Sequence, residues 1–461
     1  MAYCILKSYK LRVDPFLVFA VLKEETNCFF LDSSLNSSYA QGRYSFLGID
    51  PFFTLKTKNE DPFEKIREAL NKYRISGVRP KLPFLGGAVG YFAYDLGLIL
   101  EKKIKSKTKL DLGIPDCFLG FYNSTVIIDH LKNLLYVFSI GFPERSSSLA
   151  KTLAESNFKK IYKLLSKIEL AKNCKKPRAS KIALAQLNSN FTKEEYLWTI
   201  KKAKEYIKEG DIYQVNLSQM FNTNSSLSGF DIYQRLRKIS PSYFSAYLDL
   251  GSFQILSSSP ERFLKLEGDR VVTCPMKGTR PRSKNRLNDQ RLKRELLESA
   301  KDKAELIMIV DLERNDLGRV CSYDSIKVRT LRQLEEYSTV FQTTATVQGR
   351  LHKNKDRTDL LRACFPGGSI TGCPKIRAME IIEELEPTRR SVYTGSLGYL
   401  SFCGSMDFNI LIRTILKKDD RLYFSVGGGI VADSKPEDEY LETLVKARGM
   451  IEAIGEGRFL R

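Results

Sequence analysis

The sequence predicts an α+β protein in which a sandwich of antiparallel β-sheets is surrounded by helices. Strand-like and helix-like segments follow one another in an irregular order along the 461 residues, without the regular alternation of a doubly wound parallel fold. No Gly-x-Gly-x-x-Gly follows a predicted strand and no Walker sequence is present, so the sequence does not indicate a nucleotide-binding sheet. The predicted class is therefore antiparallel, and its site must be found from other motifs.

The pattern along the chain divides it into three regions. Residues 1–145 contain short alternating segments separated by turns, among them Cys28–Asp32, Tyr44–Leu47 and Ser124–Asp129. Residues 146–190 are rich in Ser and Lys, and contain a predicted helix at Leu149–Ile168 and a linker at Cys174–Ser180. Residues 191–461 carry the stronger patterns.

The third region begins with a predicted helix. Thr192 and Glu195 form a capping box, apolar residues follow at helical spacing, and Gly210 ends the helix. Strands are predicted next over 253–274, around the turn at 267–269, followed by a helix over Asn288–Ile307 that runs into a strand-like piece at Ile307–Asp311. A helix over Pro374–Glu386 and strands over 395–402, 408–416 and 421–427 follow. The last predicted helix runs from Ser434 to about Ile454 and has a second capping box at Ser434 and Glu437.

The composition excludes several classes of function. There are 74 Lys and Arg against 54 Asp and Glu, a net charge of +20, but much of the excess lies in lysine-rich stretches that are typical of solvated loops. A basic nucleic-acid-binding protein with a degenerate enzyme fold remains the alternative of a different class. With only two histidines and no Cys-x-x-Cys among nine cysteines, histidine triads and zinc sites are nearly excluded. No membrane-length apolar run or secretory signal is found, so we expect a soluble cytoplasmic protein.

Two predicted helices carry acidic residues at helical spacing. Glu298, Asp302 and Glu305 share one face, and Glu439, Glu442 and Lys446 share another. Mg²⁺ binds one or two carboxylates together with water and substrate oxygens, so these faces are candidate metal ligands. The ordinary alternative, a solvated helix face, stays open.

Two glycine-rich turns are candidate anion sites. Pro366–Gly372 is predicted to lead directly into a helix, where backbone N–H groups and the helix dipole favour a carboxylate or phosphate. Gly427–Gly429 closes a predicted strand and lets a ligand approach the backbone. Simple turn geometry would explain both equally well.

Two cations complete the candidate set. Lys277 follows a predicted strand in Pro275-Met-Lys-Gly-Thr279, and it becomes a nucleophile only if its surroundings lower its pKa. Arg413 is placed inside the apolar run Ile410–Ile415, where a charge needs an internal carboxylate or an anionic ligand.

Taken together, these segments resemble the chorismate-utilising enzymes, which include anthranilate, aminodeoxychorismate, isochorismate and salicylate synthases. The resemblance covers almost the whole chain. It rests on Gly42–Gly48, Gly86–Leu96, Gly210–Leu217, Ser259–Phe263, Asp311–Asp316, the 366–375 loop, Gly427–Val431 and Asp433–Arg448.

The resemblance implies roles for the candidates. Glu305 and Glu442 match the family's Mg²⁺ ligands, with Asp302 and Glu439 in supporting positions, and the ion acts as a Lewis acid on chorismate. The residues that match carboxylate-binding positions are Tyr393, Arg413, Gly427, Gly428, Gly429 and Lys446, with Thr371 in the turn beside them.

Within the family, Lys277 favours the aminodeoxychorismate synthases, since the other branches usually have Ala in this motif. The resemblance implies that Lys277 attacks the ring and expels the 4-hydroxyl, that Glu261 is the general acid/base, and that ammonia then displaces the lysine. The expected partners are a glutamine amidotransferase subunit that supplies ammonia and, downstream, a lyase that removes pyruvate. Anthranilate synthesis, and isochorismate or salicylate synthesis, are the alternatives.

The chain departs from the family pattern at two places. Gln342 replaces a histidine that is associated with the aromatising loss of pyruvate, which weakens the anthranilate alternative. Tyr243 and Leu31–Ser34 only loosely follow the motifs that bind an inhibitor, so we do not expect feedback control by tryptophan.

Overall fold

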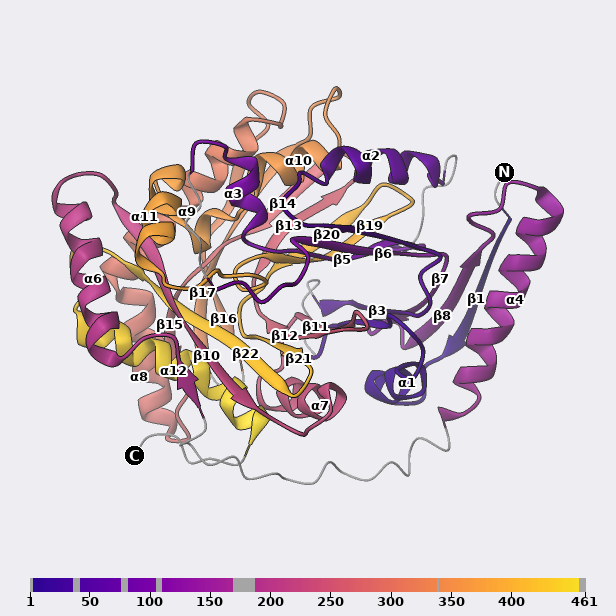
Figure 1. The fold of residues 1–461 in the computed structure, drawn as a ribbon, viewed down its shortest axis with the longest axis horizontal. Helices are drawn as coiled ribbons and strands as arrows, with labels where there is room; N and C mark the ends of the chain where they lie inside the picture. The colour runs from indigo at the N-terminus through magenta and orange to yellow at the C-terminus, as the bar shows by residue number, and fades with distance from the viewer. Residues whose placement is uncertain are drawn as a thin grey trace.

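The computed structural model describes residues 3–35, 42–75, 82–104, 110–168, 187–337 and 340–455. Two large antiparallel sheets form its centre, with helices on their outer faces (Figure 1), which confirms the predicted fold class. The predicted linker at Cys174–Ser180 lies outside the described residues.

The first sheet has twelve strands within the described residues. In spatial order they are β1 (Cys4–Lys10), β8 (Leu134–Ile140), β7 (Ser124–Asp129), β3 (Tyr44–Gly48), β2 (Phe29–Asp32), β11 (Phe244–Asp249), β12 (Gln254–Ser259), β21 (Thr414–Lys418), β22 (Arg421–Ile430), β10 (Gln214–Asn224) and β18 (Gly372–Cys373), with β9 (Asn188–Ser189) beside β10.

The second sheet has ten strands within the described residues. Their order is β15 (Met276–Pro281), β17 (Val340–Arg350), β14 (Arg270–Cys274), β13 (Arg262–Glu267), β20 (Met406–Ile410), β19 (Ser396–Ser401), β5 (Gly87–Phe92), β6 (Cys117–Tyr122) and β4 (Phe53–Thr57), with β16 (Lys327–Glu336) beside β17. Strands from both outer sequence regions join each sheet, since β2 pairs with β11 and β5 with β19. The division at residues 145 and 190 stays a prediction.

Apolar side chains fill three layers. One cluster lies between the two sheets and includes Phe46, Tyr91 and Tyr399. A second joins the first sheet to the helices α1 (Pro15–Leu22), α4 (Ser147–Leu165), α7 (Gly229–Ile239) and α12 (Pro436–Ile454). A third joins the second sheet and β10 to α2 (Phe63–Lys72), α3 (Leu96–Leu100), α6 (Lys193–Lys208), α9 (Ala300–Gly318), α10 (Arg357–Cys364) and α11 (Lys375–Leu385). No helix among the described residues has both the length and the apolar character needed to cross a bilayer.

Many predicted elements are confirmed. Thr192 and Glu195 form both hydrogen bonds of a capping box at the start of α6, and Gly210 has a φ of +84° just after that helix ends. The strands predicted over 253–274 are β12, β13 and β14, which turn at the predicted residues.

The helix predicted over Asn288–Ile307 is wrong in its bounds. It is two helices, α8 (Arg286–Glu298) and α9, because Ser299 adopts an extended conformation and caps α9 by accepting a hydrogen bond from Asp302 N. The apolar run Ile307–Asp311 continues α9 instead of forming a strand, and buries Ile309 and Val310. Glu298 therefore does not share a helix with Asp302 and Glu305.

The strand predicted over 408–416 is also wrong. The chain leaves the second sheet after β20 and enters the first sheet at β21, and Arg413 lies between them with a φ of +51°. A left-handed backbone at this residue turns the chain from one sheet to the other. Arg413 is thus placed at the junction of the sheets.

Two predicted helix starts need correction. Ser434 does not cap the last helix, which begins at Pro436; its hydroxyl donates to Glu439 Oε1 at 2.6 Å. The Pro366–Gly372 turn does not lead directly into a helix, because a 3₁₀ turn (Gly368–Ile370) and β18 come before α11.

Candidate active site

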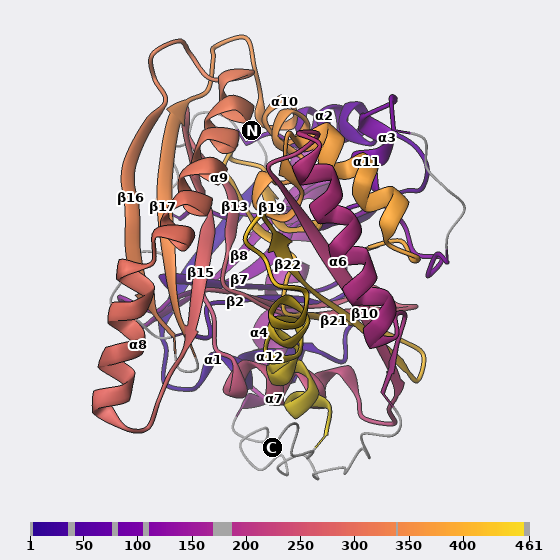
Figure 2. The same ribbon diagram turned by 90° about the vertical axis from the view of Figure 1, so that its left-hand side faces the viewer.

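A cavity of about 170 Å³ lies where the two sheets approach each other, between α9 and α12. The helix α9 packs against β15, β16 and β17, and α12 packs against β22 (Figure 2). The structure brings eleven predicted site residues together on the wall of this cavity: Glu261, Lys277, Asp302, Glu305, Tyr393, Arg413, Gly427, Gly429, Glu439, Glu442 and Lys446.

Lys277 is half-buried in the cavity wall; it follows β14, as predicted, and itself lies within a further strand, β15. Its amine lies close to the backbone of β22, since a β-carbon built on Gly429 would stand 3.0 Å from Lys277 Nζ. Burial raises the pKa of Glu305, against the opposing charge of Lys277. The charge of Lys446, with a smaller effect from Lys277, lowers the pKa of Glu442. The lysine is therefore part of a charged cluster, away from open solvent.

Glu261 precedes β13 and is almost fully buried. The hydroxyl of Ser369 donates to Glu261 Oε1 at 2.5 Å. Burial raises the pKa of Glu261 to about 7, against the opposing effects of the Ser369 hydrogen bond and the Lys277 charge. A carboxyl group with this pKa exchanges its proton readily near neutral pH, which suits a general acid/base.

Four carboxylates enter the cavity from the two helices. Asp302 and Glu305 come from α9, and Glu439 and Glu442 come from α12. Lys301 Nζ lies 4.0 Å from Glu305 Oε1 and 3.7 Å from Glu439 Oε1, and Lys446 Nζ lies 2.7 Å from Glu442 Oε1.

These carboxylates fit a hard divalent cation of the magnesium type. Repulsion from Asp302 and Glu439 adds to burial in raising the pKa of Glu305, so a further positive charge would be stabilised there. Among the described residues, no group of three or more His, Cys, Asp or Glu side chains gathers closely enough to hold an ion. A magnesium ion here would use one or two carboxylates and complete its shell with water and substrate oxygens.

Arg413 provides a cation for an anionic ligand. Burial lowers the pKa of its guanidinium, and within the described ranges no carboxylate forms an ion pair with it. Arg413 is half-buried, and because an unpaired guanidinium removed from water is costly, an anion bound in the cavity would gain two parallel hydrogen bonds from it.

Tyr393 is held beside the cavity by a buried ion pair. Arg390 donates to Glu386 through both Nε and Nη2, at 2.9 and 2.7 Å, and its guanidinium lies 5.9 Å from the centre of the Tyr393 ring. The same guanidinium donates to the carbonyls of Ile370 and Asn216, two other residues of the wall. The Arg390–Glu386 pair therefore holds Tyr393, Ile370 and Asn216 in place around the cavity.

Two predicted site residues do not line the cavity. Thr371 is fully buried, and its hydroxyl donates to the carbonyl of Gly367 at 3.0 Å, which closes the turn. Gly428 faces α12, because a β-carbon there would stand 3.1 Å from Glu439 Oε2. Contact of either residue with substrate stays a prediction.

Sequence reasoning gave no role to several polar residues of the wall, namely Asn216, Thr279, Arg280, Lys301, Gln342 and Ser369. Gln342 was noticed only as a departure from the family pattern. Its amide nitrogen donates to Thr279 Oγ1 at 3.3 Å, whereas its buried Oε1 has no hydrogen-bond partner among the described residues. Asn216 and Ser369 lie in two of the segments that carry the family resemblance, and this membership could have identified them as candidate site residues.

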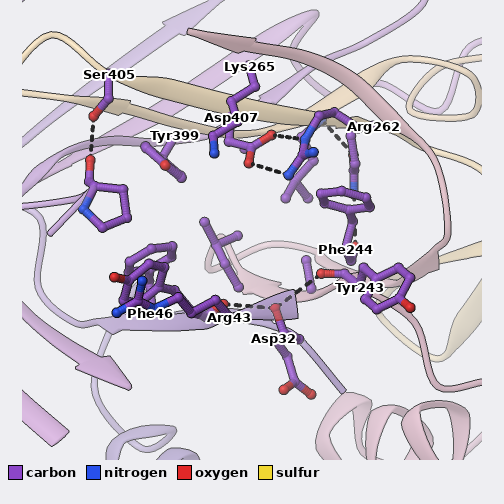
Figure 3. Close-up of a pocket in the computed structure, with 18 of the residues that line it drawn as sticks. Asp32, Arg43, Phe46, Tyr243, Phe244, Arg262, Lys265, Tyr399, Ser405 and Asp407 are labelled. Carbon is purple, nitrogen blue, oxygen red and sulfur yellow. Dashed lines mark hydrogen bonds and ion pairs between the residues drawn. The ribbon is translucent and has the colours of Figure 1, made fainter. Parts of the chain in front are cut away.

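A second cavity, of about 760 Å³, lies between the sheets (Figure 3). It contains Leu31, Ser33 and Tyr243, from the segments that only loosely follow the family's inhibitor-binding motifs and in which we did not expect feedback control by tryptophan. Arg262 and Asp407 face each other across two hydrogen bonds, at 3.0 and 3.1 Å, and the carboxylate of Asp32 points away toward α7, where it accepts from Arg237 and Tyr233. Its charged groups are therefore already paired.

Comparison with known proteins agrees with this geometry. Residues 27–452 match the family model described as chorismate binding enzyme. The chain is 38% identical over 457 residues to anthranilate synthase component 1 of Acetivibrio thermocellus, covering 95% of this chain and 92% of that protein. It is 41% identical over 426 residues to aminodeoxychorismate synthase component 1 of Salmonella typhimurium, covering 89% of each.

A solved structure is similar to this chain in fold as well as in sequence. The crystal structure of anthranilate synthase component I from Streptococcus pneumoniae matches with a TM-score of 0.76 and 30% identity, over 96% of this chain and 98% of that one. Relatives named for two different products are thus similar to the chain to nearly the same degree. By family model, sequence and fold, this chain belongs to the chorismate binding enzymes.

Proposed function

We propose that this chain is the synthase subunit of an aminodeoxychorismate synthase, which converts chorismate and ammonia to 4-amino-4-deoxychorismate for 4-aminobenzoate and folate synthesis. The observation that carries the proposal is the position of Lys277, whose amine lines the same cavity as Glu261, Arg413 and the carboxylates of α9 and α12. A neutral lysine amine is a nucleophile for carbon, and a branch that used water directly would not need one.

In the proposed reaction Arg413, Tyr393, Lys446 and the backbone of Gly427–Gly429 bind the two carboxylates of chorismate. Lys277 first releases its proton to solvent, and its neutral amine forms a bond to the ring while the 4-hydroxyl leaves as water; Glu261 donates the proton that the leaving oxygen needs. Ammonia then forms the new C–N bond as the bond to Lys277 breaks, and the carboxylate of Glu261 takes the surplus proton. The lysine and Glu261 return to their starting states.

Glu305 and Glu442, supported by Asp302 and Glu439, would hold Mg²⁺, which as a Lewis acid supports the substrate carboxylate and the departing hydroxyl. Ammonia would come from glutamine through a partner amidotransferase subunit; the relatives' names, component 1, support a second component. A separate lyase would remove pyruvate from the product.

The deciding experiment identifies the product. The protein is incubated with chorismate, Mg²⁺ and ammonium, with and without an added aminodeoxychorismate lyase, and the products are separated by chromatography against standards. We expect an aminated, non-aromatic product that becomes 4-aminobenzoate only when the lyase is present. Anthranilate formed without lyase would establish the nearest alternative, and a product formed without ammonium would establish the isochorismate or salicylate alternative.

The covalent step is tested with Lys277→Ala. We expect turnover to fall by about a thousandfold or more, because the nucleophile is lost. Lys303→Ala is the matched control, since Lys303 is an exposed lysine of α9 outside the cavity wall. Intact-protein mass spectrometry without ammonium should show an adduct on wild type and none on Lys277→Ala; unchanged product formation by Lys277→Ala would reject the covalent route.

A further inference from the structure

A buried acidic cluster lies behind the turn that carries Ser369. Glu313 and Asp316 come from α9 and Lys375 comes from the start of α11. The two carboxyl groups are 2% and 3% exposed, and neither residue lines the cavity. Glu313 and Asp316 lie in the Asp311–Asp316 motif and Lys375 in the 366–375 loop, and the proposed reaction gives none of these three residues a role.

Glu313 accepts one hydrogen bond from the turn and another from the neighbouring strand β14. The backbone N–H of Gly368 donates to Glu313 Oε1 at 3.2 Å, and the hydroxyl of Thr273 on β14 lies 3.4 Å from Oε2. A β-carbon built on Gly368 would stand 3.2 Å from Glu313 Oε1 and 2.7 Å from a methyl carbon of Leu312. Glycine is therefore the residue that lets the turn approach the carboxyl group this closely.

The cluster contains two carboxyl groups and one ammonium. Lys375 donates to Asp316 and, at 3.2 Å, to the carbonyl of Cys364 on α10. Glu313 forms no ion pair with any residue in the described ranges. One ammonium cannot neutralise two buried carboxylates, so one of the two groups keeps its proton.

The charges around Glu313 identify it as the protonated group. Burial and the neighbouring charge of Asp316 raise its pKa to about 8, Lys375 opposes them, and Glu261 across the turn raises it further. The Cys364 thiol of α10 is neutral as well, because burial raises its pKa. Burial raises the pKa of Asp316 as well, but the charges of Lys375 and Arg319 lower it, so the negative charge is better stabilised on Asp316 than on Glu313.

The turn connects this cluster to the cavity. Gly368, which Glu313 holds, is followed by Ser369, whose hydroxyl donates to Glu261. Glu313 and Glu261 therefore lie on opposite sides of one turn, and they interact electrostatically through it.

We propose that Glu313 is a positioning residue for Glu261, which it serves in its neutral form by holding the Gly368–Ser369 turn in place. The inference rests on the proposed role of Glu261 as acid/base. A neutral carboxyl group accepts the hydrogen bond from Gly368 N–H without placing a second negative charge behind the turn, beside the carboxylate that Glu261 becomes when it gives up its proton. The Ser369 hydroxyl thereby stays in place to donate to Glu261.

The test compares Glu313→Gln, Glu313→Ala and a matched control, Asp311→Asn, whose carboxylate lies exposed on the same helix beside Arg314. The values of kcat and KM are measured from pH about 6 to about 9.5 with ammonia saturating at each pH. Wild type and Asp311→Asn should lose kcat as the pH rises through about 7, because Glu261 must carry a proton in the first step. Glu313→Gln should match wild type across this range, because an amide oxygen at this position still accepts a hydrogen bond from Gly368 N–H.

Glu313→Ala removes the support of the turn. We expect kcat to fall by about tenfold while the KM for chorismate changes less than about twofold, because Glu313 does not line the cavity. Loss of the Ser369 hydrogen bond, which lowers the pKa of Glu261, should also move the alkaline loss of kcat to higher pH in Glu313→Ala, whereas a role in folding alone would lower Tm and leave the pH profile of kcat unchanged. A kcat of Glu313→Gln as low as that of Glu313→Ala, or an unchanged kcat in Glu313→Ala, would overturn the proposal.

A readout without turnover separates this inference from the proposed function. Infrared difference spectra between neutral and alkaline pH should show a larger loss of carboxylic acid C=O absorption in wild type than in Glu313→Gln, since Glu261 and Asp95 also lose protons near this range in both proteins. If wild type forms no aminated product but shows this larger loss, the proposed function fails and the protonated state of Glu313 stands. If the two spectra are the same, the inference fails.

Discussion

The two cavities differ in size and in how their charges are satisfied. The larger one, of about 760 Å³, contains six charged side chains that are all paired: Arg262 with Asp407, Lys265 with Glu267, Asp32 with Arg237 and Arg43 with Asp129. In the smaller one, of about 170 Å³, Lys277, Glu261 and Arg413 form no ion pair with any residue in the described ranges. The candidate site is therefore distinguished by charges left without partners and not by cavity volume.

Replacing one arginine in each cavity by methionine should give the largest difference between the two cavities. Arg413→Met should lower kcat/KM for chorismate by about a hundredfold, since a charge-assisted contact is lost, with little change in Tm. Arg262→Met should instead cost about 3–5 kcal/mol of stability, because the Asp407 carboxylate loses its partner, and leave the KM for chorismate unchanged. Steady-state kinetics and calorimetry decide. An effect of Arg262→Met on KM would show that the two cavities are not independent.

A smaller effect is expected from filling the space beside Lys277. A β-carbon at Gly429 would stand 2.5 Å from Gln214 Nε2 and 3.0 Å from Lys277 Nζ. Gly429→Ala should therefore displace the amine and lower kcat by about tenfold or more. Gly318→Ala, where nothing lies within 4 Å of the new carbon, is the control and should behave as wild type. Equal activity of the two variants would contradict the placement of the amine.

Asp95, a buried acid that lines neither cavity, tests whether a raised pKa is enough to identify a functional residue. Burial raises the pKa of Asp95 to about 7, while its Oδ2 accepts a hydrogen bond from Ser391 N. The folded chain therefore binds this proton more tightly than the unfolded chain does. The stability that the bound proton contributes is complete below the unfolded pKa and is lost as the pH rises through about 7, a loss on the order of 4 kcal/mol.

Tm should accordingly fall between pH about 4 and about 7 in wild type, and less steeply in Asp95→Asn. Calorimetry at several pH values measures the slope. The kcat of Asp95→Asn should equal that of wild type, since Asp95 lines neither cavity. A large loss of kcat in Asp95→Asn would show that a buried acid outside the candidate site also affects turnover.

The smallest effect is expected at the edge of the larger cavity. Arg43 pairs with Asp129, which also accepts hydrogen bonds from the backbone N–H groups of Leu131 and Lys132. Arg43→Gln therefore leaves Asp129 satisfied and should cost less than about 1 kcal/mol. Thermal unfolding and turnover should both be close to wild type. A loss of activity would mean that this cavity takes part in the reaction.

Sequence reasoning located the site better than it located the elements that carry it. The spacing of Glu439 and Glu442 was sufficient because both do lie on one helix. The spacing of Glu298, Asp302 and Glu305 was misleading, because a single capping serine starts a new helix at Ser299. The run Ile307–Asp311 has the length and composition of a buried strand as well as of a buried helix, and only packing decides between them.

Other features depend on contacts between distant parts of the chain. No local pattern shows that Arg413 lies at a junction of sheets, because the apolar residues on both sides belong to different sheets. Glu313 reads as an ordinary polar helix residue, and its role emerges only when Gly368, 55 residues further along the chain, lies against it. Side chains that act across the fold were thus the ones that the sequence did not reveal.

The way the strands interleave limits how the polypeptide can be divided. Separating the first 145 residues from the last 271 would strip β2 of β11 and β5 of β19, and each fragment would then present unpaired strand edges together with apolar faces from the layer between the sheets. Such fragments should aggregate when made singly and recover activity only when refolded together. For engineering, the whole length must be treated as one inseparable folding unit.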